Sequence, residues 1–384
     1  LASAEGLAKR ESSVTAPVVY VGSGVTAPEL GYDDYAGVDV RDKIVVLLTE
    51  APASFPSDQR AFYSRSLYKV ENAAAHGAAG VLRMLTPEGQ LRRPWESQVQ
   101  HADSPGLSWV DEGGRGRAFD PGIRGVAALS PKATKNLFAG APHSLKEVFA
   151  AAEAGRPLSF ALPVEASLRM VGREERAASA NVAAVLPGSD PRLREEYVVL
   201  TAHLDHLGVG EPVDGDAIYN GAYDNASGIA VLLETAKAFA RLPVAPRRSL
   251  LFLAVTGEER GMQGSDFFAR HPTVPAGSIV ANINLDMFLM FNPLRDVVAF
   301  GGEHSSLGRV VEEAAGRMGI GVSPDPFPEE VIFVRSDHFA FVQQGIPAIM
   351  LFNGFRTEGS ETGGQEAFRT WMRERYHKPG DDLE

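Results

Sequence analysis

The 384-residue sequence predicts a mixed α/β fold, in which helices flank a mostly parallel sheet and a second, β-rich α/β module comes first in the chain. Three observations support this prediction. The length is too great for one ordinary core and suggests two or three domains. From Ala166 onward, apolar strands alternate with helical segments, as in a sheet covered by helices on both faces. Before that point, short β-rich runs are separated by Gly- and Pro-rich turns.

The first module is predicted from four apolar runs between Val14 and Val164. One helical pattern, Phe62 to His76, interrupts them. These residues contain few of the charged clusters that catalysis requires, so we expect the chemistry to lie in the second half. The four runs are PVVYVG (17–22), KIVVLL (43–48), AGVLRML (79–85) and GVAALS (125–130).

The second half is predicted to build the sheet. A helix over Ala226–Arg241 places apolar residues at helical spacing and should pack on this sheet. The acidic, Gly-containing residues 208–225 before it are predicted to form a long loop, and long loops in compact domains are often functional. The predicted strands are NVAAVLPG (181–188), YVVLTAH (197–203), SLLFLAVTG (249–257), SIVANINLD (278–286), VVAFGG (297–302) and AIMLF (348–352).

Composition narrows the possible partners. The net charge of −12 and the pI near 5.3 disfavour nucleic acid and anionic lipid, whose phosphates would be repelled, and favour a small or peptide-like ligand. No apolar run approaches the about 20 residues of a membrane span. The absence of cysteine excludes disulfides, thiolate zinc sites and cysteine nucleophiles. The chain begins at Leu1 without a basic segment followed by an apolar one, so we expect any signal peptide to have been removed or never present. The oligomeric state is not indicated.

Potential metal ligands lie at the ends of three of the predicted strands. His203 and Asp286 end the second and fourth strands, and Glu258 and Glu259 follow the third. Each has an ordinary explanation by itself, such as a solvated Glu pair or a carboxylate in a turn. Together they would lie at one edge of the sheet, where open α/β sheets bind ligands. Imidazole and carboxylate without thiolate suit a catalytic zinc site better than a structural one.

Two further candidates lie outside the strands. Asp224 comes just before the predicted helix, where an ordinary helix cap would also be found. His377 lies in YHKPGDD, near the end of the sequence.

Six stretches resemble, in the same order, the motifs of co-catalytic di-zinc aminopeptidases, whose relatives include glutamate carboxypeptidases and glutaminyl cyclases. The resemblance implies a zinc exopeptidase fold, two zinc ions per chain and removal of N-terminal residues from peptides. It implies that His203 and Asp286 hold one zinc, that Glu259 and His377 hold the other, and that Asp224 bridges both. The stretches are TAHLDHLG, NGAYDNASG, TGEERGMQGS, NINLDM, RSDHFAF and YHKPGDD.

The same resemblance gives the adjacent carboxylates different roles. Glu258 would be the general base that accepts a proton from a metal-bound water, whose pKa the metal lowers from about 15.7 towards about 7. Glu259 can ligate a metal at the same turn because neighbouring side chains point in different directions. Asp205 resembles the carboxylate that orients the imidazole of His203. Tyr223 stands where many simple members of the family carry an acidic residue. The resemblance therefore does not indicate how the amino group of a substrate would be bound.

The first half resembles a protease-associated domain through GYDDYAGVDVRDKIVVLL and KVENAAAHGAAGVLRM. The resemblance implies an inserted domain that covers or narrows the active site. We therefore expect residues 1–13 to begin the peptidase domain, 14–165 to form the protease-associated domain, and 166–384 to form the catalytic domain. A periplasmic or secreted location is also implied by the resemblance.

Three alternatives remain open at this point. A carboxypeptidase would need an Arg to bind a carboxylate, and Arg260, Arg335 and Arg356 are candidates. A glutaminyl cyclase would use one zinc, and a receptor-like binding protein would have lost activity.

We favour cleavage at a free amino terminus because the negative net charge and the acidic segment 211–216 would attract a cationic amino group. Met287, Phe288 and Phe333, near the ligand motifs, predict an apolar residue at the cleaved position.

Overall fold

The computed structural model describes residues 8–100, 106–113, 122–288 and 292–383. The chain divides into two compact units. The first comprises Leu1–Gly106 and Val110–Ala178, and the second comprises Leu107–Trp109 and Ser179–Glu384. Residues 1–7, predicted to begin the peptidase domain, lie outside the described residues.

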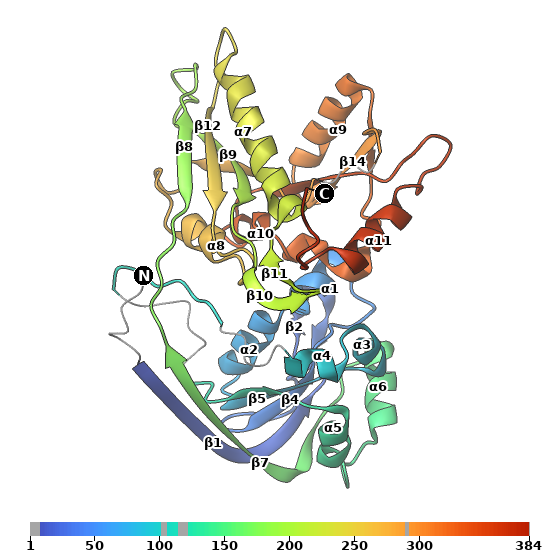
Figure 1. Cartoon of the computed structure of the whole chain (residues 1–384). Coiled ribbons are helices and arrows are strands. Elements are labelled where there is room, and N and C mark those ends of the chain that lie inside the picture. Colours follow the sequence, from blue (N-terminus) through green and yellow to red (C-terminus); the bar gives the residue numbers. More distant parts are fainter. Residues whose placement is uncertain (1–7, 101–105, 114–121, 289–291, 384) are drawn as a thin grey trace. The chain divides into compact units, whose positions relative to one another are not determined.

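The first unit is built on a five-stranded sheet with the order β6-β5-β4-β1-β7 (Figure 1). All neighbouring strands are parallel except β7, which is antiparallel to β1. The predicted helix over 62–76 is two helices, because Arg65 adopts an extended conformation between them. The strands are β1 (Ala8–Val21), β4 (Ile44–Leu48), β5 (Gly80–Met84), β6 (Val126–Ala128) and β7 (Ser159–Glu174), and the α-helices are α1 (Ser57–Tyr63), α2 (Ser66–Ala75), α3 (Pro87–Arg92), α4 (Trp95–Gln100), α5 (Pro131–Leu137) and α6 (Leu145–Glu153).

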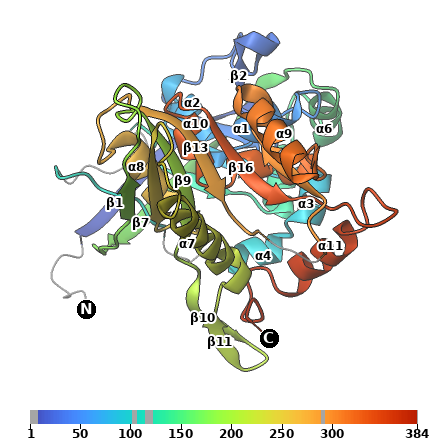
Figure 2. The same ribbon diagram turned by 90° about the horizontal axis from the view of Figure 1, so that it is seen from above.

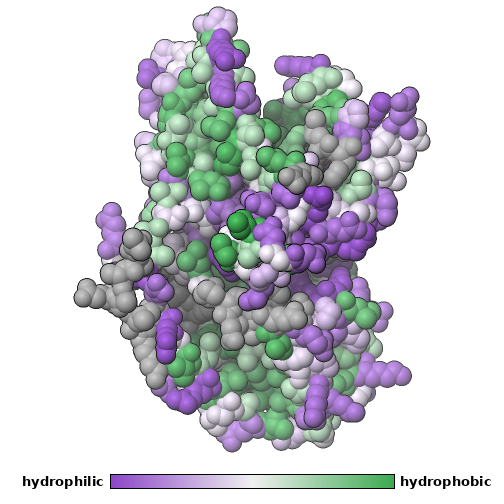
Figure 3. Space-filling model, viewed as in Figure 1, coloured by the Kyte–Doolittle hydropathy of each residue, from purple (hydrophilic) through white to green (hydrophobic). Residues whose placement is uncertain are grey.

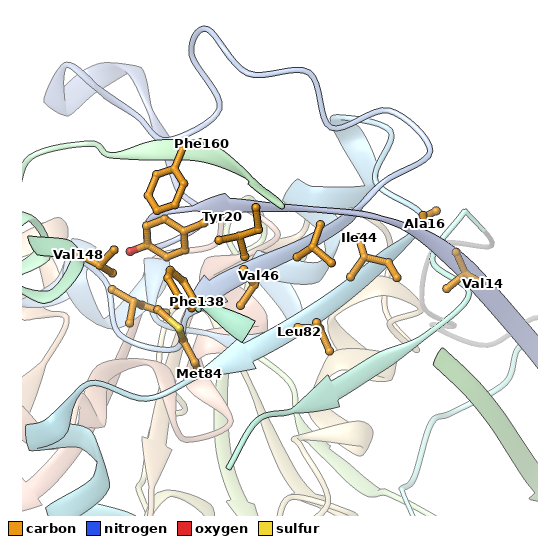
Figure 4. Close-up of a cluster of buried hydrophobic side chains, with 14 residues drawn as sticks. Val14, Ala16, Tyr20, Ile44, Val46, Leu82, Met84, Phe138, Val148 and Phe160 are labelled. Carbon is orange, nitrogen blue, oxygen red and sulfur yellow. The ribbon is translucent and has the colours of Figure 1, made fainter. Parts of the chain in front are cut away.

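Both faces of this sheet are buried, which explains the continuous apolar run of β4. Ile44 and Val46 face a cluster centred on Tyr20, whose ring lies 5.5 Å from that of Phe138 and 5.3 Å from that of Phe160 (Figure 4). The alternate residues of β4 pack with α2 on the other face. A strand covered on both faces loses the alternation of polar and apolar residues.

The boundary between the units differs from the division predicted from the sequence. The pairing of β1 with β7 runs from Ala8 opposite Glu174 to Val21 opposite Ser159. Residues 8–13 and 166–174 are therefore part of the first unit. The boundary was predicted from the change in sequence pattern along the chain. Such a change does not reveal that two long strands, distant in sequence, are hydrogen-bonded to each other.

The second unit confirms the predicted fold class. Its seven-stranded sheet has the order β15-β14-β16-β13-β9-β12-β8, and the central strands β16, β13, β9 and β12 are parallel. The outer strand β8 is antiparallel to β12, and β14 is antiparallel to β16. The strands are β8 (Val182–Leu186), β9 (Tyr197–His203), β12 (Ser249–Val255), β13 (Ile279–Leu285), β14 (Asp296–Phe300), β15 (Gly321–Ser323) and β16 (Ala348–Asn353).

Helices cover both faces of this sheet. On one face lie α7 (Ser227–Ala240) and α9 (Leu307–Met318), as Figure 2 shows, with Leu232 packed against the strands. On the other face, α8 (Gln263–Arg270) and α10 (His338–Val342) pack through Phe268 and Phe341. The helix predicted over 226–241 is thus confirmed as α7. A further helix, α11 (Gln365–Glu374), precedes His377.

Residues 208–225 contain a hairpin as well as the predicted loop. The strands β10 (Gly208–Val213) and β11 (Asp216–Tyr219) are joined by Asp214 and Gly215, whose φ angles are 53° and 92°. An Asp-Gly pair with two positive φ angles is a favoured two-residue hairpin turn. The sequence therefore contained the signal for this hairpin.

The surface of the second unit carries apolar side chains around β8 and α7 (Figure 3). Val182, Val185 and Leu233 are among its exposed residues. None of the helices in the described ranges is long and apolar enough to span a bilayer.

The central strand β12 provides a test of this packing. Leu251 is fully buried between β9 and β8, so Leu251→Ala should lower the free energy of unfolding by about 2–5 kcal/mol through lost burial and the cavity that remains. Val182→Ala on the neighbouring strand should change it by less than about 0.5 kcal/mol, because Val182 is 62% exposed. Urea denaturation measures both variants, and equal losses would contradict the packing described.

Candidate metal centre

The carboxyl ends of neighbouring parallel strands bring together the residues predicted from the motifs. His203 is the last residue of β9, Glu258 and Glu259 follow β12, and Asp286 follows β13. Asp224 lies in a short irregular helical turn, Ala222–Ala226, directly before α7, and His377 follows α11. Residues from five separate segments of the chain thus meet at one edge of the sheet.

The first group of contacts surrounds His203. Its Nε2 atom lies 3.1 Å from Asp224 Oδ1 and 3.3 Å from Asp286 Oδ1. All three side chains are buried. Their donor atoms lie close enough together to share one metal ion.

The second group surrounds Glu259. His377 Nε2 lies 3.1 Å from Glu259 Oε2 and 3.2 Å from Asp224 Oδ2. Asp224 therefore directs one oxygen to each group, Oδ1 to His203 and Oδ2 to His377. A carboxylate in this position can serve two ions at once.

Several of these atoms lack a hydrogen-bond partner despite their burial. They include His203 Nε2, Asp286 Oδ1, Glu259 Oε1 and His377 Nε2. Leaving buried polar atoms without partners is costly, and native proteins rarely do so. A divalent cation would satisfy these atoms together, and a set of imidazoles and carboxylates fits zinc. The residues present therefore fit a pair of metal ions.

The tautomer of neutral His203 is fixed by the main chain. Its Nδ1 atom lies 3.0 Å from the backbone carbonyl oxygen of Asp205. A carbonyl only accepts hydrogen bonds, so Nδ1 carries the proton and Nε2 presents a lone pair to the two carboxylates.

The carboxylate of Asp205, which the resemblance predicts to orient His203, lies near the same ring. Its Oδ1 atom is 4.0 Å from His203 Nδ1 and accepts a hydrogen bond from the Glu258 backbone N–H at 3.2 Å. The turn after β9 places the backbone carbonyl of Asp205 beside the ring of His203. The side chain of Asp205 contacts the main chain of the turn that carries Glu258.

Two supporting residues were missed by the sequence reasoning. Asp381 is fully buried and accepts hydrogen bonds from the backbone N–H groups of Tyr223 and Asp224, at 2.9 and 3.0 Å. Ser336 donates a hydrogen bond to Asp286 Oδ2 at 2.5 Å. Both residues lie within quoted motifs, but no pattern distinguishes Asp381 from its neighbour Asp382.

The adjacent carboxylates Glu258 and Glu259 have different environments. Burial raises the pKa of Glu258 well above its ordinary value. Burial would also raise the pKa of Glu259, but the imidazoles of His206 and His377 lower it to about 2. Burial lowers the pKa of His377, whereas Asp224 and Glu259 raise it, to about 9 overall. Glu259 is thus held as an anion, while Glu258 has an increased affinity for a proton.

A cavity of about 240 Å³ opens beside these residues. Asp224, Glu258, Glu259, Asp286 and His377 form its polar side, and Tyr376, whose ring stacks 3.8 Å from that of His377, also lines it. Its apolar wall consists of Met287, Phe327, Ile332, Met350, Phe352, Phe368 and Met372.

Of the residues predicted to contact substrate, Met287 lies in this wall. Tyr223 and Phe288 are not among the described residues that line the cavity. Phe333 is buried, with its ring against those of His338 and Phe339. The aromatic rings that do line the cavity come from segments far apart in the chain, and no sequence pattern marks them.

Of the three candidate arginines, Arg335 alone appears among the described lining residues. Its guanidinium lies 3.7 Å from the carboxylate of Glu330, another lining residue. Arg356 instead pairs with Glu361 at 2.7 Å.

This site has the composition of a hydrolytic metal centre, with nitrogen and oxygen donors beside a cavity that can hold a substrate. Residues 181–384 match the family model described as Peptidase family M28. The match covers more than half of the chain, and the protein belongs to this family of peptidases.

Individual relatives match stretches of different lengths. It is 37% identical over 107 residues to a probable zinc metalloprotease of Pyrenophora teres f. teres, covering 28% of this chain and 22% of that protein. It is 26% identical over 243 residues to a probable leucine aminopeptidase 2 of Aspergillus oryzae, covering 59% and 44%. The chain thus spans less than half the length of these curated relatives. A solved aminopeptidase from Aneurinibacillus sp. strain AM-1 is 21% identical, with 98% of this chain and 70% of that chain covered and a TM-score of 0.45.

Proposed function

We propose that the protein is a zinc-dependent aminopeptidase with two zinc ions per chain. The observation that carries this proposal is the position of Asp224. Its two carboxylate oxygens face two separate groups of potential metal-ligand atoms that lack hydrogen-bond partners. His203 and Asp286 would hold one ion with Asp224, and Glu259 and His377 would hold the other. Zinc ions bound there would polarise the scissile carbonyl and bring the pKa of a water molecule towards about 7.

Glu258 is proposed as the general base. It lines the cavity, and burial raises the pKa of its carboxyl well above the ordinary value. A carboxylate with such a pKa can take a proton from the attacking water and give it to the leaving amine. The hydrogen bond from its backbone N–H to Asp205 holds the turn in place.

The cavity favours a free amino terminus with an apolar first side chain. Four carboxylates on its polar side attract a cation, and its opposite wall is built from Phe, Met and Ile side chains. The name of the Aspergillus oryzae relative, a probable leucine aminopeptidase, agrees with this preference.

The first unit is proposed to be a protease-associated domain. The β4 strand ends one of the two stretches that resemble this domain, and the other stretch spans α2 and β5. A periplasmic or secreted location also belongs to this proposal and rests on the family resemblance.

A carboxypeptidase is the second candidate, because Arg335 lines the cavity and could bind a terminal carboxylate. The nearby Glu330 offsets its charge. A glutaminyl cyclase with one zinc ion would not use the ligand atoms around Glu259. The presence of every predicted ligand disfavours an inactive receptor.

Three versions of one peptide distinguish the two peptidases. We expect Leu-Gly-Gly and its C-terminal amide to lose leucine at similar rates, and N-acetyl-Leu-Gly-Gly to resist, because acetylation removes the cationic amine. The products are identified by mass spectrometry, with the Glu258→Gln protein as a control for contaminating peptidases. Hydrolysis of the acetylated peptide from its carboxyl end, with resistance of the amide, would replace the aminopeptidase by the carboxypeptidase.

A further inference from the structure

A third imidazole, His206, lies beside the two groups of predicted ligands and has no role in the function proposed above. Its side chain is 7% exposed, and both of its ring nitrogens lack a hydrogen-bond partner. Gly221, with a φ of 69°, packs directly over it, since a Cβ there would lie 2.6 Å from the ring atom Cγ of His206. The loop that carries Asp224 therefore covers this imidazole, and the cost of its unsatisfied nitrogens requires an explanation.

The atom closest to His206 belongs to a predicted ligand. His206 Nδ1 lies 2.7 Å from Glu259 Oε1, yet the geometry of the contact is not that of a hydrogen bond, and both atoms remain unpartnered. Glu259 thus has an imidazole at each oxygen, His206 at Oε1 and His377 at Oε2. The two rings lie 5.7 Å apart at an angle of 70°. Such contacts arise when several donors point to a common centre instead of to one another.

The spacing also suits a shared ion. Ligand atoms of His206, Asp224 and Glu259 all lie within 4.8 Å of one another, as do those of His203, Asp224 and Asp286. Asp224 belongs to both sets. His206 therefore relates to the Glu259 group as His203 relates to the Asp286 group.

We propose that His206 is a fourth protein ligand of the ion held by Asp224, Glu259 and His377. This inference rests on the proposed two-metal centre and makes its two sites unequal. The ion at His203 and Asp286 has three protein ligands, including Asp224, and keeps a position open for water or substrate. The ion at Glu259 has four, the number typical of closed zinc sites. The Glu259 ion is accordingly the tightly held one, and the His203 ion is the exchangeable one.

The substitution His206→Asn separates ligation from a supporting role. The amide N–H₂ of Asn can replace Nδ1 as a hydrogen-bond donor to Glu259, but an amide is a poor zinc ligand. Metal-free protein is titrated with Zn²⁺ in competition with a chromophoric chelator, and X-ray absorption counts imidazoles in the zinc-loaded protein. We expect wild type to bind two ions, and the variant to bind one of them at least about 100-fold more weakly, at the upper end of the about 10- to 100-fold cost of losing an orienting residue. The imidazole count should fall from three to two per pair of ions.

The matched control is His271→Asn, which makes the same chemical change at an exposed position of the second unit. It should leave the affinities for both zinc ions unchanged. Thermal unfolding of the metal-free proteins shows whether His206→Asn folds as wild type does. Unchanged zinc affinities and an unchanged imidazole count in His206→Asn would overturn the assignment of His206 alone. Binding of fewer than two ions by wild type would instead overturn the proposed two-metal function.

Discussion

Glu258→Gln should abolish most peptide hydrolysis while retaining both metal ions. Gln has nearly the same shape as Glu but cannot accept the proton of the attacking water, and a general base contributes about 10²- to 10⁴-fold to the rate. The side chain of Glu258 lies in the cavity wall, and burial raises the pKa of its carboxyl. Steady-state turnover of a leucine substrate and elemental analysis of the same preparation give the two quantities.

The neighbouring residue provides a matched comparison. Glu259→Gln makes the same chemical change one position along the chain, but the oxygens of Glu259 lie 2.7 Å from His206 and 3.1 Å from His377. We expect this variant to lose zinc affinity first, with activity restored in part by excess Zn²⁺. Equal metal loss in the two variants would show that base and ligand are wrongly assigned.

Asp224→Ala should have the largest effect on metal content. Its two oxygens face His203 at 3.1 Å and His377 at 3.2 Å, so its removal takes a ligand from both proposed ions. His377→Ala takes a ligand from one ion only and should leave the proposed ligands of the other ion unchanged. Zinc per chain after dialysis against a weak chelator is expected to fall in the order wild type, His377→Ala, Asp224→Ala.

An exposed acidic residue controls for the change in charge. Asp216→Ala in the β10–β11 hairpin removes one carboxylate from the same unit and should retain the zinc content of wild type. If His377→Ala lost as much zinc as Asp224→Ala, the ions would bind as one cooperative pair and the independent roles of the two groups would be wrong.

The sequence by itself determined the fold class of the second unit and predicted which of its polar side chains would lie together. Apolar runs such as that of β12 are long enough to indicate buried strands. Where such strands are parallel, their carboxyl ends lie at the same edge of the sheet. His203 and Asp286 could be predicted to meet because the ends of adjacent parallel strands necessarily lie at one edge. Asp224 and His377, which lie outside the strands, depended on the resemblance of their motifs to a known family.

Only the tertiary structure decided the contacts that depend on distant segments. The carbonyl of Asp205 orients His203, Asp381 holds the loop of Asp224, and His206 faces Glu259. The apolar wall of the cavity and the β1–β7 pairing were likewise absent from any local pattern. Periodicity reports which face of one element is buried, because burial repeats with the geometry of the helix or strand. It carries no information about which atoms of other elements lie across from that face, since those positions are set by how the packed elements place their side chains in space.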